Sequence, residues 1–397
     1  MLLENKYHLT YCTNIHPGQD WESTLNSLKE YVPGIKSAVS PDQPFGLGLR
    51  LSNKASEELA KGNRMNEFKK WLQDQDVYIF TMNGFPYGNF HNERVKDDVH
   101  TPDWTTKERL AYTQRLFHQL AELIPEGING GISTSPISYK HWFKSEVEKQ
   151  AAFKKGAKQM LLVAKQLFEL EKSTGKYLHL DIEPEPDGFL ENTDEVLSFY
   201  KDYLFPAGRD ILAKDLNLDP DELENLVRRY ITICYDICHF SLAYEEPTET
   251  FKKFKQAGIQ IGKIQVSAAL KILFEQGDNQ EVWDLLEKFN EPTYLHQVTE
   301  KSGDGVKTYN DLPVVLEKKN SAKELRAHFH VPIFLEQFEA LYSTQDQILK
   351  TLEYLRTDPI SEHLEIETYT WDVLPEALKE NLSSSIIREI NWLKSHL

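Results

Sequence analysis

Short runs in which apolar and polar residues alternate are separated by long amphipathic segments over most of the chain. In the run LHLDIE the apolar residues fall on one face of an extended strand, while His179, Asp181 and Glu183 fall on the other. This pattern is typical of a strand that packs against helices on its apolar side. Comparable runs predict strands at residues 7–14, 45–51, 77–83, 129–134, 177–183, 231–236, 262–267 and 364–369.

The segments between these runs carry signals of helix ends. Thr105 and Glu108 form a capping-box pattern, Gly175 ends a long amphipathic segment, and Asp219 precedes a proline that begins another. Eight strands that alternate with helices predict a single α/β domain over residues 1–397, a (β/α)8 TIM barrel. Two doubly wound domains are the alternative, but no phosphate-binding glycine fingerprint follows the first strand, and no linker-like composition lies near the middle.

One segment departs from the alternation. Residues 290–335 contain YLHQV and AHFHVPIF, two further strand-like runs around a charged stretch with glycines. We expect an insertion after the seventh barrel strand. Because the loops that follow barrel strands build the active-site face, this insertion is expected to shape a pocket there.

The balance of charge limits the partners of the protein. The chain has 45 Lys and Arg against 62 Asp and Glu, a formal net charge of -17, so its average field repels nucleic-acid backbones. Cys12, Cys234 and Cys238 match neither zinc-ribbon nor C-x-x-C spacing and are expected to be reduced, buried thiols. The N-terminal segment lacks a basic region followed by an apolar run, and no run of about eighteen apolar residues occurs. We therefore expect a soluble cytoplasmic protein without membrane insertion. We expect its partner to be a small molecule. The sequence makes no prediction of oligomeric state.

Acidic and amide side chains gather where the predicted strands end. If the apolar residues of each strand face the helices, four such side chains point into the barrel near its carboxyl-terminal mouth: Glu183, Asp236, Gln265 and Glu367. Several carboxylates in one partly buried mouth repel one another unless a proton or a cation lies among them. Oxygen ligands favour Mn²⁺ or Mg²⁺, with Zn²⁺ or Co²⁺ as alternatives. A single glutamate at a strand end is more often solvated or hydrogen-bonded, so this prediction depends on the coincidence of all four.

Histidines follow the same strands. His239 lies three residues after Asp236 in a D-x-x-H turn, which can bring both side chains to one cavity. His296, His328 and His330 lie in the predicted insertion and could supply a ligand that the seventh strand lacks. Any one histidine is more often a satisfied polar residue than a ligand.

The loop NGFPYGNFH follows the third strand with glycines, a proline and aromatic rings, and it has no helical pattern. One interpretation is a rigid loop that packs on its own rings. The other is a cavity wall that stacks on a sugar-like face and donates hydrogen bonds from Asn83 or His91.

Several of these strings together resemble a known group of proteins. LDIEPEP, YDICH and IETYTW are similar to the xylose isomerase-like TIM-barrel superfamily of sugar isomerases, sugar epimerases and apurinic endonucleases. Within it, the chain resembles the EboE family, described as metabolite traffic proteins, through YHLTYCTNIHPG, NGFPYGNFH, LHLDIEPEP, HFHVPIF and TYTWDVLP. The resemblance covers most of the chain.

The resemblance implies a metal held by a Glu on the fifth strand, an Asp on the sixth, a His on the seventh and a Glu on the eighth. Glu183, Asp236 and Glu367 match this set. His239 matches the histidine that accompanies the aspartate.

The seventh and eighth strands leave two assignments open. Gln265 stands where the family has a histidine, so either the affinity for metal is reduced or His296 or His330 substitutes. Glu365 and Glu367 point the same way. We assign the metal to Glu367, which is nearer the end of the strand, and contact with substrate to Glu365.

Two functions fit this predicted site. The first is a divalent-metal-dependent isomerase or epimerase that acts on a sugar-like or cyclitol-like molecule through a metal-stabilised enediolate. Glu183 and Glu367 would act as base and acid, and His239 would bond a substrate oxygen. The second is a non-catalytic metabolite-binding or traffic protein. A glycosidase or an apurinic endonuclease fits less well, because the crowded acids and imidazoles favour a metal and the acidic chain lacks a basic track for DNA.

Overall fold

The structure is a computed structural model that describes residues 1–397 except 89–95, 304, 320–321, 372–373 and 375–380. All the predicted barrel strands are present. The first is shorter than predicted, because Thr13–Ile15 form a 3₁₀ turn. The strands are β2 (Tyr7–Tyr11), β3 (Phe45–Arg50), β4 (Val77–Asn83), β5 (Gly130–Thr134), β6 (Leu178–Ile182), β7 (Ile231–Asp236), β8 (Ile261–Val266) and β15 (His363–Ile366).

These strands are parallel and close into a barrel. They pair in the order β2-β15-β8-β7-β6-β5-β4-β3, and β1 (Leu2–Leu3) adds antiparallel to β2. A parallel bridge joins Cys12 to Gly48 where β2 meets β3, and the main-chain N–H of Gly48 donates to Thr10 Oγ1 at 2.9 Å. The predicted (β/α)8 barrel is confirmed.

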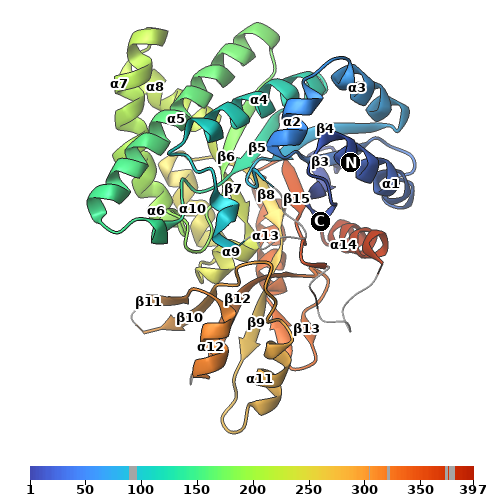
Figure 1. Ribbon diagram of the computed structural model, residues 1–397, viewed down its shortest axis with the longest axis vertical. Coiled ribbons are helices and arrows are strands. Elements are labelled where there is room, and N and C mark those ends of the chain that lie inside the picture. The colour runs from blue at the N-terminus through green and yellow to red at the C-terminus, as the bar shows by residue number, and fades with distance from the viewer. Residues whose placement is uncertain (89–95, 304, 320–321, 372–373, 375–380) are drawn as a thin grey trace.

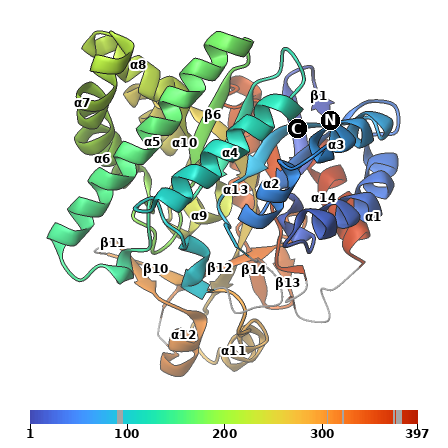
Figure 2. The ribbon, with the colours of Figure 1, turned by 45° about the horizontal axis from the view of Figure 1, so that its top comes forward.

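Helices cover the outside of the barrel (Figures 1 and 2). Leu178, Leu180 and Ile182 of β6 are fully buried on that side. Burying a large apolar side chain contributes about 1.5–3 kcal/mol relative to leaving it exposed, so the alternating pattern fixes which face of each strand meets the helices. The helices are α1 (Trp21–Val39), α2 (Asn53–Leu59), α3 (Arg64–Asp74), α4 (Lys107–Leu123), α5 (Glu146–Thr174), α6 (Thr193–Phe199), α7 (Phe205–Leu216), α8 (Pro220–Tyr230), α9 (Ile237–Leu242), α10 (Pro247–Ala257), α13 (Gln345–Thr357) and α14 (Leu382–His396), with short turns η2 (Lys96–His100), η3 (Lys140–Trp142) and η4 (Tyr200–Leu204).

Capping residues fix where several of these helices begin and end. Asp219 caps α8, and its side chain accepts the main-chain N–H of the third helical residue at 2.9 Å. Gly175 ends α5 in the left-handed region with φ of 73°, as predicted. The predicted N-cap of α4, Thr105, was wrong by one residue, because the N-cap is Thr106. The Thr105 hydroxyl donates to Asp103 at 2.6 Å and does not cap the helix.

A second, antiparallel sheet interrupts the barrel between β8 and α13, and we call it the inserted sheet. It occupies the lower part of Figure 1 and lies below the mouth of the barrel in that view. Its strands pair in the order β11-β10-β12-β9-β14-β13. They are β9 (Ala268–Leu273), β10 (Val298–Ser302), β11 (Gly305–Tyr309), β12 (Glu324–Val331), β13 (Gln337–Phe338) and β14 (Leu341–Ser343), with helices α11 (Gln280–Glu287) and α12 (Leu312–Lys318). The predicted range 290–335 lies inside this longer segment.

An ion pair lies inside the barrel, further from its mouth than the strand ends. Lys263 donates to Glu365 Oε2 at 2.6 Å, and neither side chain is exposed. Gly48 faces this pair so closely that a Cβ there would lie 1.7 Å from Glu365 Oε1. Position 48 therefore requires glycine because a side chain there would collide with the carboxylate, and not because of its backbone conformation. Lys263 was not among the predicted site residues.

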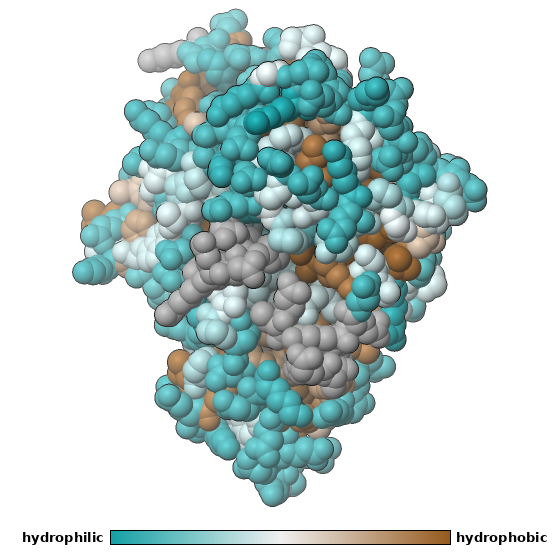
Figure 3. All heavy atoms as spheres, turned by 45° about the vertical axis from the view of Figure 1, so that its right-hand side comes forward, coloured by the Kyte–Doolittle hydropathy of each residue, from teal (hydrophilic) through white to brown (hydrophobic). Residues whose placement is uncertain are grey.

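The face of the molecule in Figure 3 is mostly hydrophilic, with small, scattered apolar patches. Within the ranges that the structure describes, no helix has both the length and the apolar character needed to cross a bilayer.

Candidate metal centre and substrate cavity

Three carboxylates meet at the mouth of the barrel. Glu183 follows β6, Asp236 ends β7, and Glu367 follows β15. One carboxylate oxygen from each lies within 4.8 Å of the others, and all three residues are buried. The parallel barrel explains this meeting, because the carboxyl ends of its strands point to the same rim. We call Glu183, Asp236 and Glu367 the carboxylate centre.

The charge of the carboxylate centre is not balanced by its neighbours. Burial, followed by the charges of Glu367 and Asp236, raises the pKa of Glu183 well above its usual range. Burial also raises the pKa of Glu367, and the charges of Asp236 and Glu365 add to the effect. For Asp236, burial alone would raise the pKa, but the nearby imidazoles of His239 and His330 and the hydrogen bonds from Ser267 and the main-chain N–H of His239 together outweigh it, and its pKa is lowered. A cation among these groups would relieve their repulsion.

Two of the three carboxylates present an oxygen with no hydrogen-bond partner among the described residues. These atoms are Glu183 Oε2 and Asp236 Oδ2, and both are buried. The second oxygen of Asp236 accepts from Ser267 Oγ at 2.6 Å and from the main-chain N–H of His239 at 3.2 Å. A buried carboxylate oxygen without a donor is costly, so this arrangement fits a divalent cation bound at these oxygens.

His330 of β12 brings a nitrogen ligand to the same place. Its Nδ1 donates to the main-chain carbonyl of Glu367 at 2.7 Å, which leaves the lone pair on Nε2. Nε2 is buried and has no hydrogen-bond partner in the described part of the chain. One ligand atom each from His330, Asp236 and His239 lie within 4.8 Å of one another. Burial lowers the pKa of His330 to about 4, so the ring is neutral at neutral pH and suited to bind a metal.

Gln265 was predicted as the ligand from the seventh strand, and the structure places it beside Asp236 in the register of β7 and β8. Its amide oxygen accepts the thiol of Cys234 at 3.0 Å. That oxygen is therefore already engaged, whereas His330 Nε2 is not.

Two asparagines orient the third carboxylate. Asn14 Nδ2 donates to Glu367 Oε1 at 2.7 Å, and Asn83 Nδ2 donates to the same oxygen at 3.0 Å. Both bonds hold Glu367 in one rotamer at the edge of the cavity described below. Asn83 was predicted to contact substrate, and it does line this cavity. Asn14 was not predicted as a site residue, although it ends the predicted strand 7–14, and in the structure it lies in the 3₁₀ turn Thr13–Ile15.

His239 and His328 face each other at the junction of the barrel and the inserted sheet. Their Nε2 atoms lie 3.0 Å apart. His239 Nδ1 bonds the carbonyl of Pro184 at 3.0 Å, and His328 Nδ1 bonds the amide oxygen of Gln297 at 2.9 Å. Burial lowers the pKa of His328 well below its usual range.

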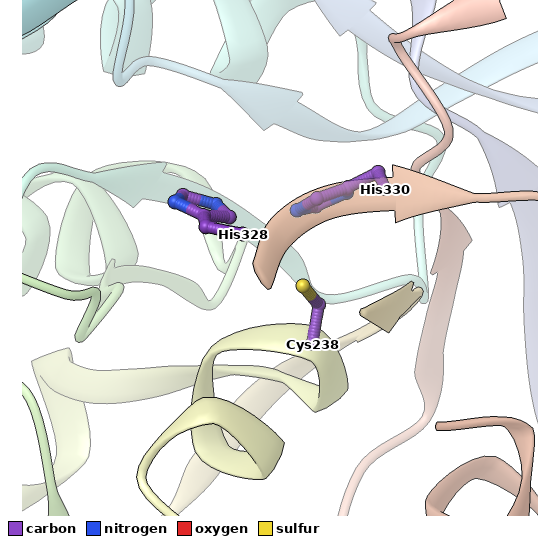
Figure 4. A group of neighbouring side chains, drawn as sticks. All are labelled: Cys238, His328 and His330. Carbon is purple, nitrogen blue, oxygen red and sulfur yellow. The ribbon is translucent and has the colours of Figure 1, made fainter. Parts of the chain in front are cut away.

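Cys238 of α9 completes this group of side chains. Figure 4 shows its sulfur directed toward the space between His328 and His330, and one ligand atom from each of the three lies within 4.8 Å of the others. Burial raises the pKa of the Cys238 thiol well above its usual range. The predicted reduced, buried thiols are all present as free cysteines.

The remaining predicted site residues lie elsewhere. His296 Nε2 bonds Glu291 at 2.7 Å and its Nδ1 bonds the carbonyl of His328 at 2.9 Å, so both ring nitrogens are engaged away from the carboxylate centre. Glu365 is paired with Lys263 inside the barrel and does not line the cavity. His91 falls outside the described residues.

A cavity lies over the carboxylate centre, between the barrel mouth and the inserted sheet. Polar groups and rings share its wall, including His100, whose Nε2 lies 2.8 Å from Glu185 Oε1. Phe85 lies in the loop NGFPYGNFH, which was predicted as a cavity wall, whereas His100, Tyr294 and Tyr369 were not among the predicted site residues. The barrel side and its loops supply Asn14, Asn83, Phe85, Pro86, Lys96, Val99, His100, Glu183, Glu185, His239, Glu367 and Tyr369, and the inserted segment supplies Tyr294, Leu295, Gln297 and His328.

Comparisons with known proteins now identify the fold. No protein-family model and no curated protein sequence matches the chain. Among solved structures, a xylose isomerase-like TIM-barrel protein from Mycobacterium smegmatis, in complex with magnesium, is similar with a TM-score of 0.50 and 10% identity over 100% of this chain and 98% of that chain. This chain has the xylose isomerase-like TIM-barrel fold.

Two further solved structures are similar to the chain with lower scores. A D-tagatose 3-epimerase-like protein has a TM-score of 0.47 with 10% identity over 98% of this chain and 96% of that chain. IOLI protein with a binding zinc atom has a TM-score of 0.46 with 10% identity over 98% of this chain and 99% of that chain. The structure from Mycobacterium smegmatis confirms the predicted xylose isomerase-like barrel as a fold, and the resemblance to the EboE family stays a prediction.

Proposed function

We propose that this protein is a divalent-metal-dependent isomerase or epimerase of a small, polyhydroxylated molecule. The observation that carries the proposal is the carboxylate centre, in which Glu183 Oε2 and Asp236 Oδ2 are buried without a hydrogen-bond partner among the described residues. One ligand atom of His330, whose Nε2 also lacks a partner among them, lies within 4.8 Å of one from Asp236. Glu183, Asp236, Glu367 and His330 would hold the metal. Bound there, a divalent cation would act as a Lewis acid for the negative charge that develops when a proton leaves carbon.

The side chains around the cavity suit a molecule with many hydroxyl groups. Tyr294, Tyr369 and Phe85 offer apolar ring faces, while His100 offers an imidazole beside them. Such a mixture is typical of sites that hold the carbon face of a sugar and bond its oxygens.

The same buried carboxylates can move a proton. Glu183 and Glu367 both line the cavity, so either one can meet a proton on the carbon of a bound molecule. The two residues come from β6 and β15, which are not neighbours in the barrel, so they approach the cavity from different sides. We assign Glu183 as the base and Glu367 as the acid. His239 lines the cavity, but its Nδ1 bonds the carbonyl of Pro184 and its Nε2 faces His328 Nε2, so the predicted bond from His239 to a substrate oxygen is not part of this proposal.

An exchange experiment tests this function. The protein is incubated with Mn²⁺ and a panel of unphosphorylated ketoses, aldoses and inosose-type cyclitols in D₂O, and proton NMR follows the loss of the signal at the carbon next to the carbonyl group. Exchange that is abolished in Glu183→Gln and retained in Glu146→Gln, which changes an exposed carboxylate on α5, would support the proposal. Equal exchange in wild type and Glu183→Gln would contradict it.

A binding or traffic protein, as in the EboE family that the sequence resembles, is the second candidate. The engagement of Gln265 by Cys234 favours it, because the position that the family fills with a metal ligand is here used for an internal hydrogen bond. Tight binding of a metabolite without exchange of any proton in the same NMR experiment would favour this candidate over the first.

A further inference from the structure

Glu185 is a fourth carboxylate in the wall of the cavity, and the carboxylate centre does not include it. The residue lines the cavity and is only 7% exposed. Its Oε1 atom is buried and accepts no hydrogen bond from the described residues. A carboxylate in this state is costly to bury unless a ligand supplies a partner for its charge.

The turn that carries Glu185 is held on both sides. Pro184 and Pro186 flank the residue, and each ring fixes its own φ angle. The carbonyl of Pro184 accepts from His239 Nδ1 at 3.0 Å, and the carbonyl of Pro186 accepts from Gln297 Nε2 at 3.1 Å. Glu185 is therefore in position before a ligand arrives, which lowers the entropic cost of binding to it.

His100 lies beside this carboxylate but does not neutralise it. Its Nε2 is 2.8 Å from Glu185 Oε1. A positively charged imidazole has N–H donors at both ring nitrogens. His100 Nδ1 is buried and has no hydrogen-bond partner within the described ranges, so a charged ring would leave one donor unsatisfied. The charge of Glu185 is thus left for a ligand to balance.

The described residues that line the cavity carry an excess of negative charge. Lys96 is the one lysine or arginine among them, and its Nζ lies 2.6 Å from Asp311 Oδ2. A divalent cation would offset two of the three charges of the carboxylate centre, and Glu185 adds a further charge beside it. The excess persists with a metal bound, so the cavity attracts a cationic ligand and repels an anionic one.

Aromatic rings complete the wall around this charge. Phe85, Tyr294 and Tyr369 line the same cavity. Tyr294 and Tyr369 meet edge to face with their ring centroids 5.3 Å apart, and the ring of Phe85 lies 5.4 Å from that of His100. Ring faces attract cations, so a carboxylate beside aromatic rings suits an ammonium group.

We infer that the substrate carries a protonated amino group beside its hydroxyl groups, as an amino sugar or an amino cyclitol does, and that Glu185 binds this ammonium. The inference rests on the proposed function for the cavity, since the metal would hold hydroxyl groups of the same molecule. Phosphorylated and carboxylated sugars are disfavoured, because no unpaired lysine or arginine among the described lining residues would receive their charge.

Two small probes test the charge without regard to stereochemistry. Tris and pentaerythritol share three hydroxymethyl groups, and near neutral pH Tris has a protonated amine where pentaerythritol has a fourth hydroxymethyl group. Saturation-transfer NMR measures the Kd of each probe for the protein in excess Mg²⁺, a cation that prefers oxygen ligands to an amine. Glu185→Gln removes the charge at nearly constant shape, and Glu146→Gln, which changes an exposed carboxylate on α5, is the matched control.

We expect wild type and Glu146→Gln to bind Tris about tenfold more tightly than pentaerythritol, because the ammonium pairs with a fixed carboxylate. In Glu185→Gln the two Kd values should be equal. Equal Kd values in wild type, a preference for Tris that persists in Glu185→Gln, or no binding of Tris to wild type would each overturn the inference.

Wild type alone decides the matter if Glu185→Gln does not fold. At a pH above the pKa of the Tris amine, the Kd of Tris should rise to that of pentaerythritol. A ratio of the two Kd values that stays constant across this pH range would overturn the inference.

The proton-exchange experiment separates this inference from the proposed function. Exchange with neutral sugars that depends on Glu183, without any preference for Tris, would overturn the inference alone. A preference for Tris that depends on Glu185, without exchange of any proton, would contradict the proposed function and leave the ammonium site supported.

Discussion

At the scale of single residues, the barrel interior depends on one buried cation. Lys263 is fully buried, pairs with Glu365 and also donates to Ser133 Oγ at 3.1 Å. Its charge lowers the pKa of both Glu183 and Glu367, against the effect of their burial. Lys263 therefore reduces the excess negative charge of the carboxylate centre without touching the cavity.

Replacing this lysine by an isosteric apolar residue is expected to be strongly destabilising. Lys263→Met leaves Glu365 as an unpaired buried charge, and breaking a buried ion pair in this way costs about 3–5 kcal/mol. Urea unfolding measures the loss in the free energy of unfolding. The double variant Lys263→Met with Glu365→Gln should recover most of it, because no charge is then left unpaired. A single variant that is no less stable than the double variant would contradict this account.

At the scale of elements, much of the fold could be predicted because its signals are local. Period-two alternation marked all the barrel strands, and Gly175 and Asp219 marked helix ends. β9 was missed, because IGKIQVSAALKIL reads as one run with no glycine or proline between β8 and β9, and only pairing with distant β12 and β14 separates them.

The site could likewise be predicted only where local signals mark its residues. The positions of Glu183, Asp236 and Glu367 at the barrel mouth could be predicted from the direction of their strands alone. Glu365 has the same place in the alternation, and only the contact with Lys263 shows that it forms an ion pair inside the barrel instead. The engagement of Gln265 by Cys234 and the approach of His330 depend on contacts between segments far apart in the chain. No pattern within one strand encodes such contacts.

Helix α14 contains a pH-dependent contact with the barrel. Glu389 accepts from Thr368 Oγ1 at 2.7 Å and from the main-chain N–H of Ile333 at 3.1 Å, so it ties the helix to the segments after β15 and β12. Burial raises the pKa of Glu389 from 4.5 to about 8. Between these pH values the unfolded chain has released this proton and the folded protein has not, so stability falls as the pH rises through this window.

Glu389→Gln should remove that contribution to the pH dependence. Wild type should lose roughly 3–5 kcal/mol of its free energy of unfolding relative to the variant as the pH rises from 4.5 to 8. Above pH 8 the difference between the two proteins should stay constant. Urea unfolding at a series of pH values measures it, with the exposed Glu146→Gln as control. Parallel pH profiles for wild type and Glu389→Gln would show that Glu389 ionises normally in the folded protein.

At the scale of the whole molecule, the xylose isomerase-like barrel supplies the carboxylates and the inserted sheet supplies His328 and His330. A metal bound between them would join the two parts of the fold. Because such an ion binds the folded state and not the unfolded chain, it stabilises by about 2.7 kcal/mol at a concentration 100-fold above its Kd.

Mn²⁺ or Zn²⁺ should therefore raise the melting temperature of the chelator-treated protein. The rise should be reversed by a chelator and be much smaller in His330→Ala, which lacks the ligand from the inserted sheet. Differential scanning calorimetry measures it, with NaCl added at the same ionic strength as a control for screening. An equal rise in wild type and His330→Ala would show that the inserted sheet does not contribute to the metal site.

The most direct test of the central claim is the metal content of protein purified without a chelator or a metal-affinity tag. Elemental analysis compares wild type with Glu183→Ala and Glu367→Ala, and with Glu185→Gln, which changes the same cavity outside the carboxylate centre. The account predicts bound divalent metal in wild type and Glu185→Gln, and a loss of about one ion per chain in each alanine variant. No metal in wild type, even after incubation with Mn²⁺, Zn²⁺ or Mg²⁺, would contradict it.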